Sequence, residues 1–214
     1  MNFDILSQFG PATLAVFGTL AILSFAAVSV AFFKVFQFSR LGVGRRKEAE
    51  HILDAWLSGR VDEAAQMASA RKSVLSRILQ AVFTGQQARP GDAEYAEELG
   101  RQTAIIELAA MGERMRVLDM VVQAAPMLGL LGTVIGMIDA FSILSLAEGA
   151  ADPTELANGI WTALTTTAVG LAIAIAAFFV SSWFEARIDR ERNLIEALVS
   201  AAVHGRVDST VKPG

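Results

Sequence analysis

Three long apolar runs dominate the hydrophobic pattern of this chain. Charged residues are absent from residues 5–33, 120–138 and 156–184, and polar stretches separate these runs. Each run is long enough to cross a bilayer, since an α-helix needs about 20 mostly apolar residues to do so. The pattern therefore predicts an all-α membrane protein with three transmembrane helices.

The polar stretch after the first run shows helical spacing of its apolar residues. Helices are predicted for E-A-E-H-I-L-D-A-W-L, R-V-D-E-A-A-Q-M-A-S-A and S-V-L-S-R-I-L-Q-A-V-F, and T-G-Q-Q-A-R-P-G-D interrupts them around Pro90 and Gly91. From Asp92 to Arg116 the chain lacks proline and is expected to continue unbroken into the second span. The polar part is interpreted as a helical stalk rather than an enzyme domain. Six residues form the apolar stripe of the third helix: Val74, Leu75, Ile78, Leu79, Val82 and Phe83.

The basic residues predict the orientation. All 18 lysines and arginines lie either between Lys34 and Arg116 or after Glu185. Because positive residues mark the cytoplasmic side, the N-terminus is expected outside and the C-terminus inside. The first run lacks a positive leader and a small-residue cleavage site, so we expect a retained helix. The predicted segments are a periplasmic segment at 1–11, spans at 12–34, 117–146 and 157–184, a cytoplasmic helical region at 35–116, a periplasmic loop at 147–156, and a cytoplasmic extension and tail at 185–214.

Composition narrows the class of function. The chain is 53% hydrophobic with a mean hydropathy of +0.46, which favours a membrane protein, and it has no cysteine for a disulfide, a thiol nucleophile or a cysteine-based zinc site. The net charge of −4 and the absence of a basic, aromatic-rich patch argue against nucleic acid. No nucleophile–base set or metal cluster appears, so we expect neither an enzyme nor a cofactor. Three spans without an inverted repeat also argue against a solute transporter.

The second run, P-M-L-G-L-L-G-T-V-I-G-M-I-D-A-F, carries small residues along one helical face. In lipid, small residues allow two helix backbones to approach closely. One interpretation is packing within the bundle of this chain, and the other is packing against a neighbouring subunit or an inserted partner helix. The groove consists of Gly129, Gly132, Gly136 and Ala140.

The third run, G-I-W-T-A-L-T-T-T-A-V-G-L-A-I-A-I-A-A-F-F, carries four hydroxyls within six positions. Each hydroxyl can bond a carbonyl of its own helix, which would make the cluster purely structural. Alternatively, the cluster forms a polar strip that faces water or another helix and relays protons, with Thr133 of the second run as its counterpart. One arc of the helix holds Ala163, Thr166, Thr167 and Gly170, with Thr162 at its edge and Thr165 off it.

A hydroxyl cannot hold a transported proton, and the third run has no acid, base or histidine. Asp139, near the outer end of the second span, is the ionisable residue placed within a span. Intramembrane acids suggest function, but at this depth an interfacial or partner-paired carboxylate is equally compatible with the pattern. If the protein moves protons, we therefore expect a partner to supply the central titrating group.

These two runs resemble the two signature helices of the ExbB/TolQ/MotA proton-channel family, most nearly its ExbB and TolQ branch. The resemblance rests on the Gly-Thr-Val-x-Gly and Thr-Ala-x-Gly stretches, and it covers most of the chain. It implies a pentamer around a pair of single-span ExbD- or TolR-like helices, whose aspartate takes up and releases protons in the bacterial inner membrane. The resulting motion would power a TonB- or TolA-like protein, and the pore threonines would be Thr133 and Thr167.

Two positions depart from the pattern of that family. Thr162 stands where ExbB and TolQ proteins often have a glutamate, and Ala176 stands where a proline is usual. The first difference shifts the proton load to the partner's carboxylate, and the second should leave the third helix straighter. A structural membrane scaffold without proton conduction remains the competing hypothesis. Siderophore uptake, envelope constriction and other motors all remain open as the driven process.

Overall fold

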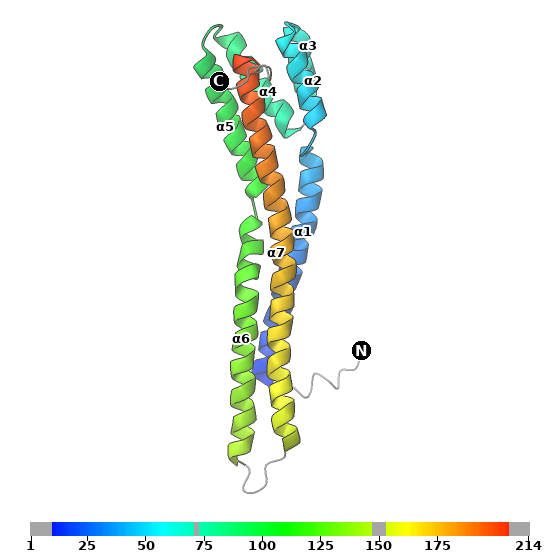
Figure 1. Ribbon diagram of the computed structural model, residues 1–214, viewed down its shortest axis with the longest axis vertical. Coiled ribbons are helices and arrows are strands. Elements are labelled where there is room, and N and C mark those ends of the chain that lie inside the picture. Colours follow the sequence, from blue (N-terminus) through cyan, green and yellow to red (C-terminus); the bar gives the residue numbers. More distant parts are fainter. Residues whose placement is uncertain (1–9, 71–72, 147–152, 206–214) are drawn as a thin grey trace, which may run out of the picture. The chain divides into compact units, whose positions relative to one another are not determined.

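The computed structural model describes residues 10–70, 73–146 and 153–205, and the regular structure within these ranges is α-helical (Figure 1). Proline occupies the first position of the first and last helices, where its missing N–H has no helical acceptor to lose. The helices are α1 (Pro11–Leu41), α2 (Arg46–Leu57), α3 (Val61–Ala70), α4 (Val74–Ala88), α5 (Ala93–Gly112), α6 (Met115–Leu146) and α7 (Pro153–His204).

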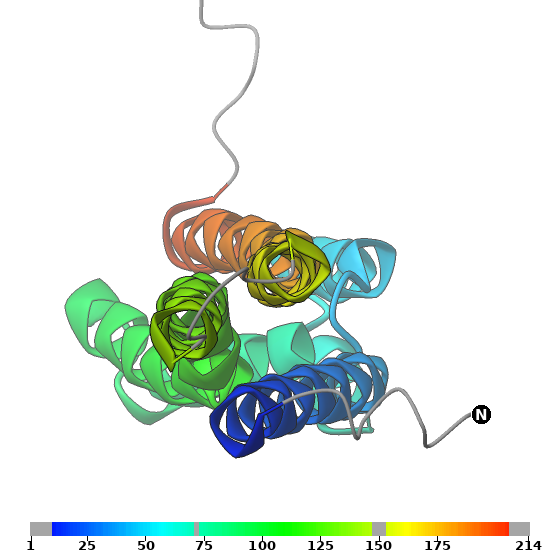
Figure 2. The ribbon, with the colours of Figure 1, turned by 90° about the horizontal axis from the view of Figure 1, so that it is seen from below.

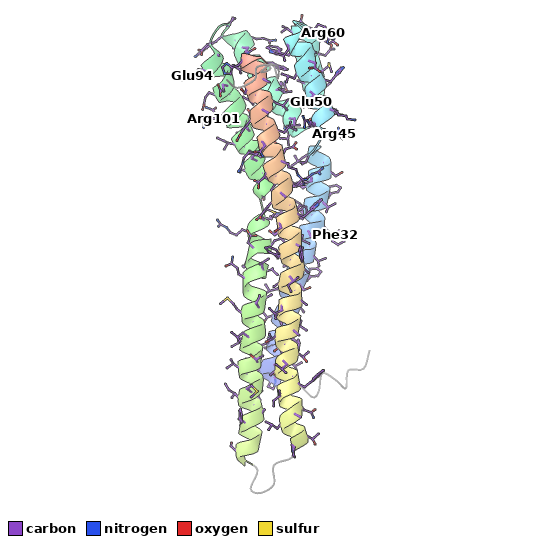
Figure 3. All side chains as sticks on the ribbon, in the orientation of Figure 1. Phe32, Arg45, Glu50, Arg60, Glu94 and Arg101 are labelled. Carbon is purple, nitrogen blue, oxygen red and sulfur yellow. The ribbon has the colours of Figure 1, made fainter. Side chains whose placement is uncertain are left out.

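The chain divides into two compact units. We call Met1–Phe32 with Arg114–Trp183 the apolar unit, and Phe33–Glu113 with Phe184–Gly214 the polar unit. The charged side chains labelled in Figure 3, such as those of α2 and α5, all belong to the polar unit. Helices α1 and α7 each contribute residues to both units.

Three helical stretches are long and apolar enough to cross a membrane, which confirms the three expected spans. They include α1 and most of α6 and α7. Large apolar side chains of these helices are exposed within the single chain: Phe25 is 75% exposed, Met127 71% and Phe179 67%. Such an apolar outer surface suits lipid rather than water, and the chain is a multi-pass membrane protein.

The polar unit has a core of large interlocking side chains. All six residues of the stripe predicted on α4 are buried, and the ring of Phe83 stacks on Trp56 of α2 with 4.0 Å between ring centroids. Ser73 and Asp92 cap the N-termini of α4 and α5 by accepting the backbone N–H groups of Ser76 and Tyr95. These helices therefore pack as a bundle, which is more than the extended stalk that the pattern suggested.

The expectation of an unbroken helix from Asp92 into the second span is wrong. Helix α5 ends at Gly112, α6 begins at Met115, and between them Arg114 has a φ of 66°. A positive φ is uncommon outside glycine and ends a helix, so the chain turns here without a proline.

Two side chains of α1 give the physical reason for this break. The Lys34 ammonium donates to the Met111 carbonyl at 2.6 Å, and the Gln37 amide donates to the Ala110 carbonyl at 2.9 Å. In a continuous helix these carbonyls would accept N–H groups four residues later, so α1 supplies their partners instead. Lys34 is fully buried, and its positive charge lies at the negative end of the α5 dipole.

Candidate functional site

The candidate site is the contact between α6 and α7 within the apolar unit, which we call the seam. The two helices lie side by side in both ribbon views (Figures 1 and 2). They run antiparallel, because residues early in α6 face residues late in α7. The contacts along the seam pair Ala140 with Gly159, Gly136 with Ala163, Gly132 with Thr166, Gly129 with Thr167, and Ala125 with Gly170.

The glycines of the seam bring the two backbones together. A Cβ built on Gly129 would lie 3.0 Å from the Cα of Thr167, and one built on Gly136 would lie 2.9 Å from the Cβ of Ala163. Any larger residue would push the helices apart. Of the two interpretations of the glycine groove, the structure places α7 of the same chain against it.

Two of the predicted threonines meet one backbone carbonyl across the seam. The Thr167 hydroxyl donates to the Gly129 carbonyl at 2.9 Å, and the Thr166 hydroxyl lies 3.3 Å from the same oxygen. The Thr166 hydroxyl also donates to the Ala163 carbonyl of its own helix at 2.7 Å, and Thr166 is fully buried. These contacts hold the polar groups of α7 against α6 rather than against lipid.

The other predicted threonines lie outside this cluster. Thr165 donates to the Trp161 carbonyl at 2.8 Å and Thr133 to the Leu130 carbonyl at 2.6 Å, so both hydroxyls bond their own helices. Thr162 is half-buried on α7. The structure thus pairs Thr166 and Thr167 with a carbonyl of α6 rather than with Thr133. Thr133 instead lines an open groove of about 660 Å³ on α6, with Val134, Met137, Ile138, Phe141, Ser142 and Ser145.

The side chain of Asp139, on α6, lies close to Gly10 at the start of α1. One of its carboxylate oxygens would be 3.2 Å from a Cβ built on Gly10. Gly10 begins the first turn of α1, since its carbonyl accepts the N–H of Leu14 at 3.0 Å. A carboxylate at a helix N-terminus is stabilised by the helix dipole. The neighbour of the Asp139 carboxylate within the chain is thus the first turn of α1.

One further polar contact of the seam was not predicted from the sequence. The Ser181 hydroxyl of α7 donates to a carboxylate oxygen of Asp119 on α6 at 2.9 Å, and Ser181 is only 4% exposed. Asp119 directly precedes the second apolar run, and its neighbours in the sequence do not indicate a partner on α7. Periodicity alone does not reveal which of two adjacent serines faces another helix.

Chemically, the middle of the seam offers hydroxyl donors and a carbonyl acceptor. Thr166 and Thr167 can accept as well as donate, so each can bind water or pass a proton along a hydrogen-bonded chain. The sequence between Asp119 and Asp139, and from Leu156 to Trp183, contains no titratable side chain that could hold a proton there. The middle of the seam can therefore relay a proton but has no group that could hold one.

The fold and the seam define a multi-pass helical membrane protein with a polar contact buried between two spans. Residues 68–197 match the model of the MotA/TolQ/ExbB proton channel family, and this range includes the whole seam. The chain belongs to that family.

Three relatives agree with this family. An ExbB homolog from Methanothermobacter thermautotrophicus is 37% identical over 126 residues, which are 54% of this chain and 44% of the relative. The ExbB-like 1 biopolymer transport protein of Synechocystis is 34% identical over 163 residues, 75% of this chain and 63% of the relative. ExbB-like 3 of the same organism is 25% identical over 174 residues, 81% of each chain. The matched part of this chain thus spans less than two thirds of the first two relatives.

Proposed function

We propose that this chain is the proton-conducting subunit of an energy-transducing complex in the bacterial inner membrane. The observation that carries the proposal is the part-buried hydrogen bond from Thr167 to the Gly129 carbonyl, between two apolar helices of a chain in a proton-channel family. The hydroxyl is placed where it can exchange the carbonyl for water or for a partner's acid. The basic residues favour a complex with the N-terminus outside and the polar unit in the cytoplasm.

A partner must supply the acid in this proposal. The central parts of α6 and α7 lack titratable residues, and the Asp139 carboxylate lies beside Gly10 at the start of α1. A single-span protein of the ExbD or TolR type, with an aspartate in its span, has the required chemistry. Around such helices we propose a homopentamer of this chain, which drives a TonB- or TolA-type protein. The names of the relatives favour the ExbB-type system.

A structural scaffold is the second candidate, and one observation favours it. The hydroxyls of Thr133, Thr165, Thr166 and Thr167 all bond backbone carbonyls in the single chain. Such bonds satisfy the hydroxyls without any water. A scaffold would need nothing more from them than helix packing.

Proton flux into liposomes separates the two candidates. The chain would be reconstituted alone, with a single-span ExbD- or TolR-like partner, and with the same partner carrying an Asp→Asn change in its span. We expect flux only with the unmodified partner. A formed complex that passes no protons in any of the three preparations would support the scaffold. Flux from the chain alone would show that the acid does not come from the partner.

A further inference from the structure

The contacts of the seam follow one antiparallel register from end to end. Ala140 meets Gly159 at one end, and Asp119 meets Ser181 at the other. The step from Ala140 back to Asp119 is 21 residues on α6, and the step from Gly159 forward to Ser181 is 22 residues on α7. The register is thus kept over about 30 Å of helix, at 1.5 Å per residue.

Small residues alone do not specify this register. On α6 they recur every three or four residues at Gly129, Gly132, Gly136 and Ala140, and α7 repeats the pattern from Gly159 to Ala177. A slide of one helical turn therefore brings another small residue opposite each glycine. Between Ala125 and Ala140 close packing would survive such a slide, because the residues paired there are glycine, alanine or threonine.

The bond from Thr167 to Gly129 does not specify the register either. Its acceptor is a backbone carbonyl, and every residue of α6 has one. The bond from Ser181 to Asp119 is different, because its acceptor is one particular carboxylate. A one-turn slide would bring Ser181 opposite Met115, which has no oxygen acceptor, or opposite the exposed Gln123, whose acceptor is a neutral amide oxygen rather than a carboxylate. It would also leave the half-buried Asp119 without its hydroxyl donor.

We propose that Asp119 and Ser181 are positioning residues that fix the register of α6 against α7. Through that register they hold the hydroxyls of Thr166 and Thr167 at the Gly129 carbonyl. The inference about register stands on the contacts alone, whereas its consequence for proton conduction rests on the proposed function. Both residues lie away from the threonines, so they act through the helices and not on the proton.

The absence of cysteine makes the register measurable by disulfide crosslinking in membranes. Ala140→Cys with Gly159→Cys reports the observed register, and Ala140→Cys with Ala163→Cys reports a one-turn slide. A Cβ on Gly159 would lie 2.6 Å from that of Ala140, so each yield is compared only with the yield of the same cysteine pair in the otherwise unchanged chain. Both cysteine pairs lie at the end of the seam remote from Asp119, so substitutions of Asp119 or Ser181 do not contact the cysteines. The ratio of the two crosslinking yields is the quantity to compare among variants.

We expect Ser181→Ala and Asp119→Ala each to lower this ratio by roughly threefold, which corresponds to the average side-chain hydrogen bond between helices in a membrane. The strongest such bonds would give a decrease of about eighteen-fold. Ser181→Thr keeps the hydroxyl and should retain the ratio, whereas Asp119→Asn keeps only a neutral amide acceptor and should lower the ratio less than Asp119→Ala does. Ser182→Ala, at the adjacent serine, is the matched control. An unchanged ratio in Ser181→Ala and Asp119→Ala would overturn the inference, as would an equal loss in Ser182→Ala.

Proton flux with the partner present, measured on the same variants without the reporter cysteines, tests the functional consequence. Flux that falls in Ser181→Ala and returns in Ser181→Thr supports the positioning role. Flux that is unchanged while the crosslinking ratio falls would overturn the link between register and conduction. If the wild-type chain conducts no protons, the proposed function fails, and the crosslinking ratio still decides whether Asp119 and Ser181 set the register.

Discussion

The seam of the apolar unit and the core of the polar unit are packed in opposite ways. In the polar unit, large side chains such as Ile78, Leu79 and Phe83 fill the space between helices, and each is at most 1% exposed. In the seam, glycines let the two backbones approach closely. A Cβ built on Gly129 would lie only 3.0 Å from the Cα of Thr167. Glycine also allows a close approach in the polar unit, where a Cβ built on Gly85 would lie 2.7 Å from the Cα of Ala96, but large buried side chains such as Leu79 and Phe83 belong to the same helix.

The difference follows from the solvent around each unit. In water, burying large apolar side chains is the main driving force for packing, so the polar unit places them inside. In lipid that driving force is absent between helices, so contact depends on close backbones and on hydrogen bonds. Many large side chains of α1, α6 and α7 accordingly lie on the outside of the apolar unit, although Leu20, Leu118 and Val121 are buried. The two units should respond oppositely to a change in side-chain size.

Removing a large side chain from the polar unit should have the largest effect. Phe83→Ala leaves a cavity beside Trp56, and we expect a loss of about 3–5 kcal/mol in the free energy of unfolding. Trp56 fluorescence during denaturation would report this loss in a chain whose Trp161 and Trp183 are replaced by Phe. Truncating the exposed Phe179 of the apolar unit to Ala is the control for size alone. A loss below about 1 kcal/mol at Phe83 would show that this core is not tightly packed.

Adding one methyl group to the seam should have the next largest effect. The Cβ in Gly132→Ala would meet the side chain of buried Thr166, and we expect a cost of about 1–3 kcal/mol. Gly18→Ala on α1 meets nothing within 4 Å and serves as the matched control. It should be neutral or stabilising by up to about 1 kcal/mol, because alanine favours a helix over glycine. Equal thermal stability of both variants in detergent would contradict the close packing of the seam.

A smaller effect is expected at Glu191 of the polar unit. Glu191 is 3% exposed, and one of its oxygens accepts the Gly44 N–H at 3.0 Å. Burial raises the pKa of Glu191 above its ordinary value of 4.5, although the Gly44 N–H and the Arg187 charge partly offset this. The folded state therefore favours the protonated form of Glu191. The contribution of this protonated form to the free energy of unfolding is fully present below pH 4.5 and is lost as the pH rises through the raised pKa.

Glu191→Gln removes this titration. Melting temperatures of the wild type and of Glu191→Gln should diverge with rising pH, the variant losing less stability. Glu98→Gln on the exposed surface of α5 is the control, because the pKa of Glu98 is lowered by its hydrogen bonds to Gln102 and Arg101. If the melting temperatures of the wild type and of Glu191→Gln change in parallel with pH, the role given to burial is contradicted.

The three spans and the helices of the polar unit could be predicted because both depend on local patterns. The stripe from Val74 to Phe83 recurs at helical spacing, and the spans are continuous apolar runs. The break at Arg114 could not be predicted in this way, because its cause lies on α1. There, Lys34 and Gln37 donate hydrogen bonds to carbonyls that are 77 and 73 residues away in sequence. Composition around Gly112 gives no sign of those distant donors.

The site was predictable in its residue types but not in its pairing. Small residues and threonines on one arc indicated the face of α7 that meets another helix. Sequence spacing suggested Thr133 as the counterpart of the threonines, whereas the structure pairs them with the carbonyl of Gly129. A backbone carbonyl has no signal in a sequence, because every residue provides one.

Proton flux of Thr167 variants, reconstituted with the single-span partner, tests most directly whether the buried hydroxyls do more than pack. Thr167→Val keeps the shape of the side chain and removes its hydroxyl, Thr167→Ser keeps the hydroxyl, and Thr165→Val removes a hydroxyl that bonds only its own helix in the structure. With equal amounts of assembled complex, we predict that flux falls to the level of protein-free liposomes in Thr167→Val and persists in the other two. Wild-type flux in Thr167→Val would contradict the account.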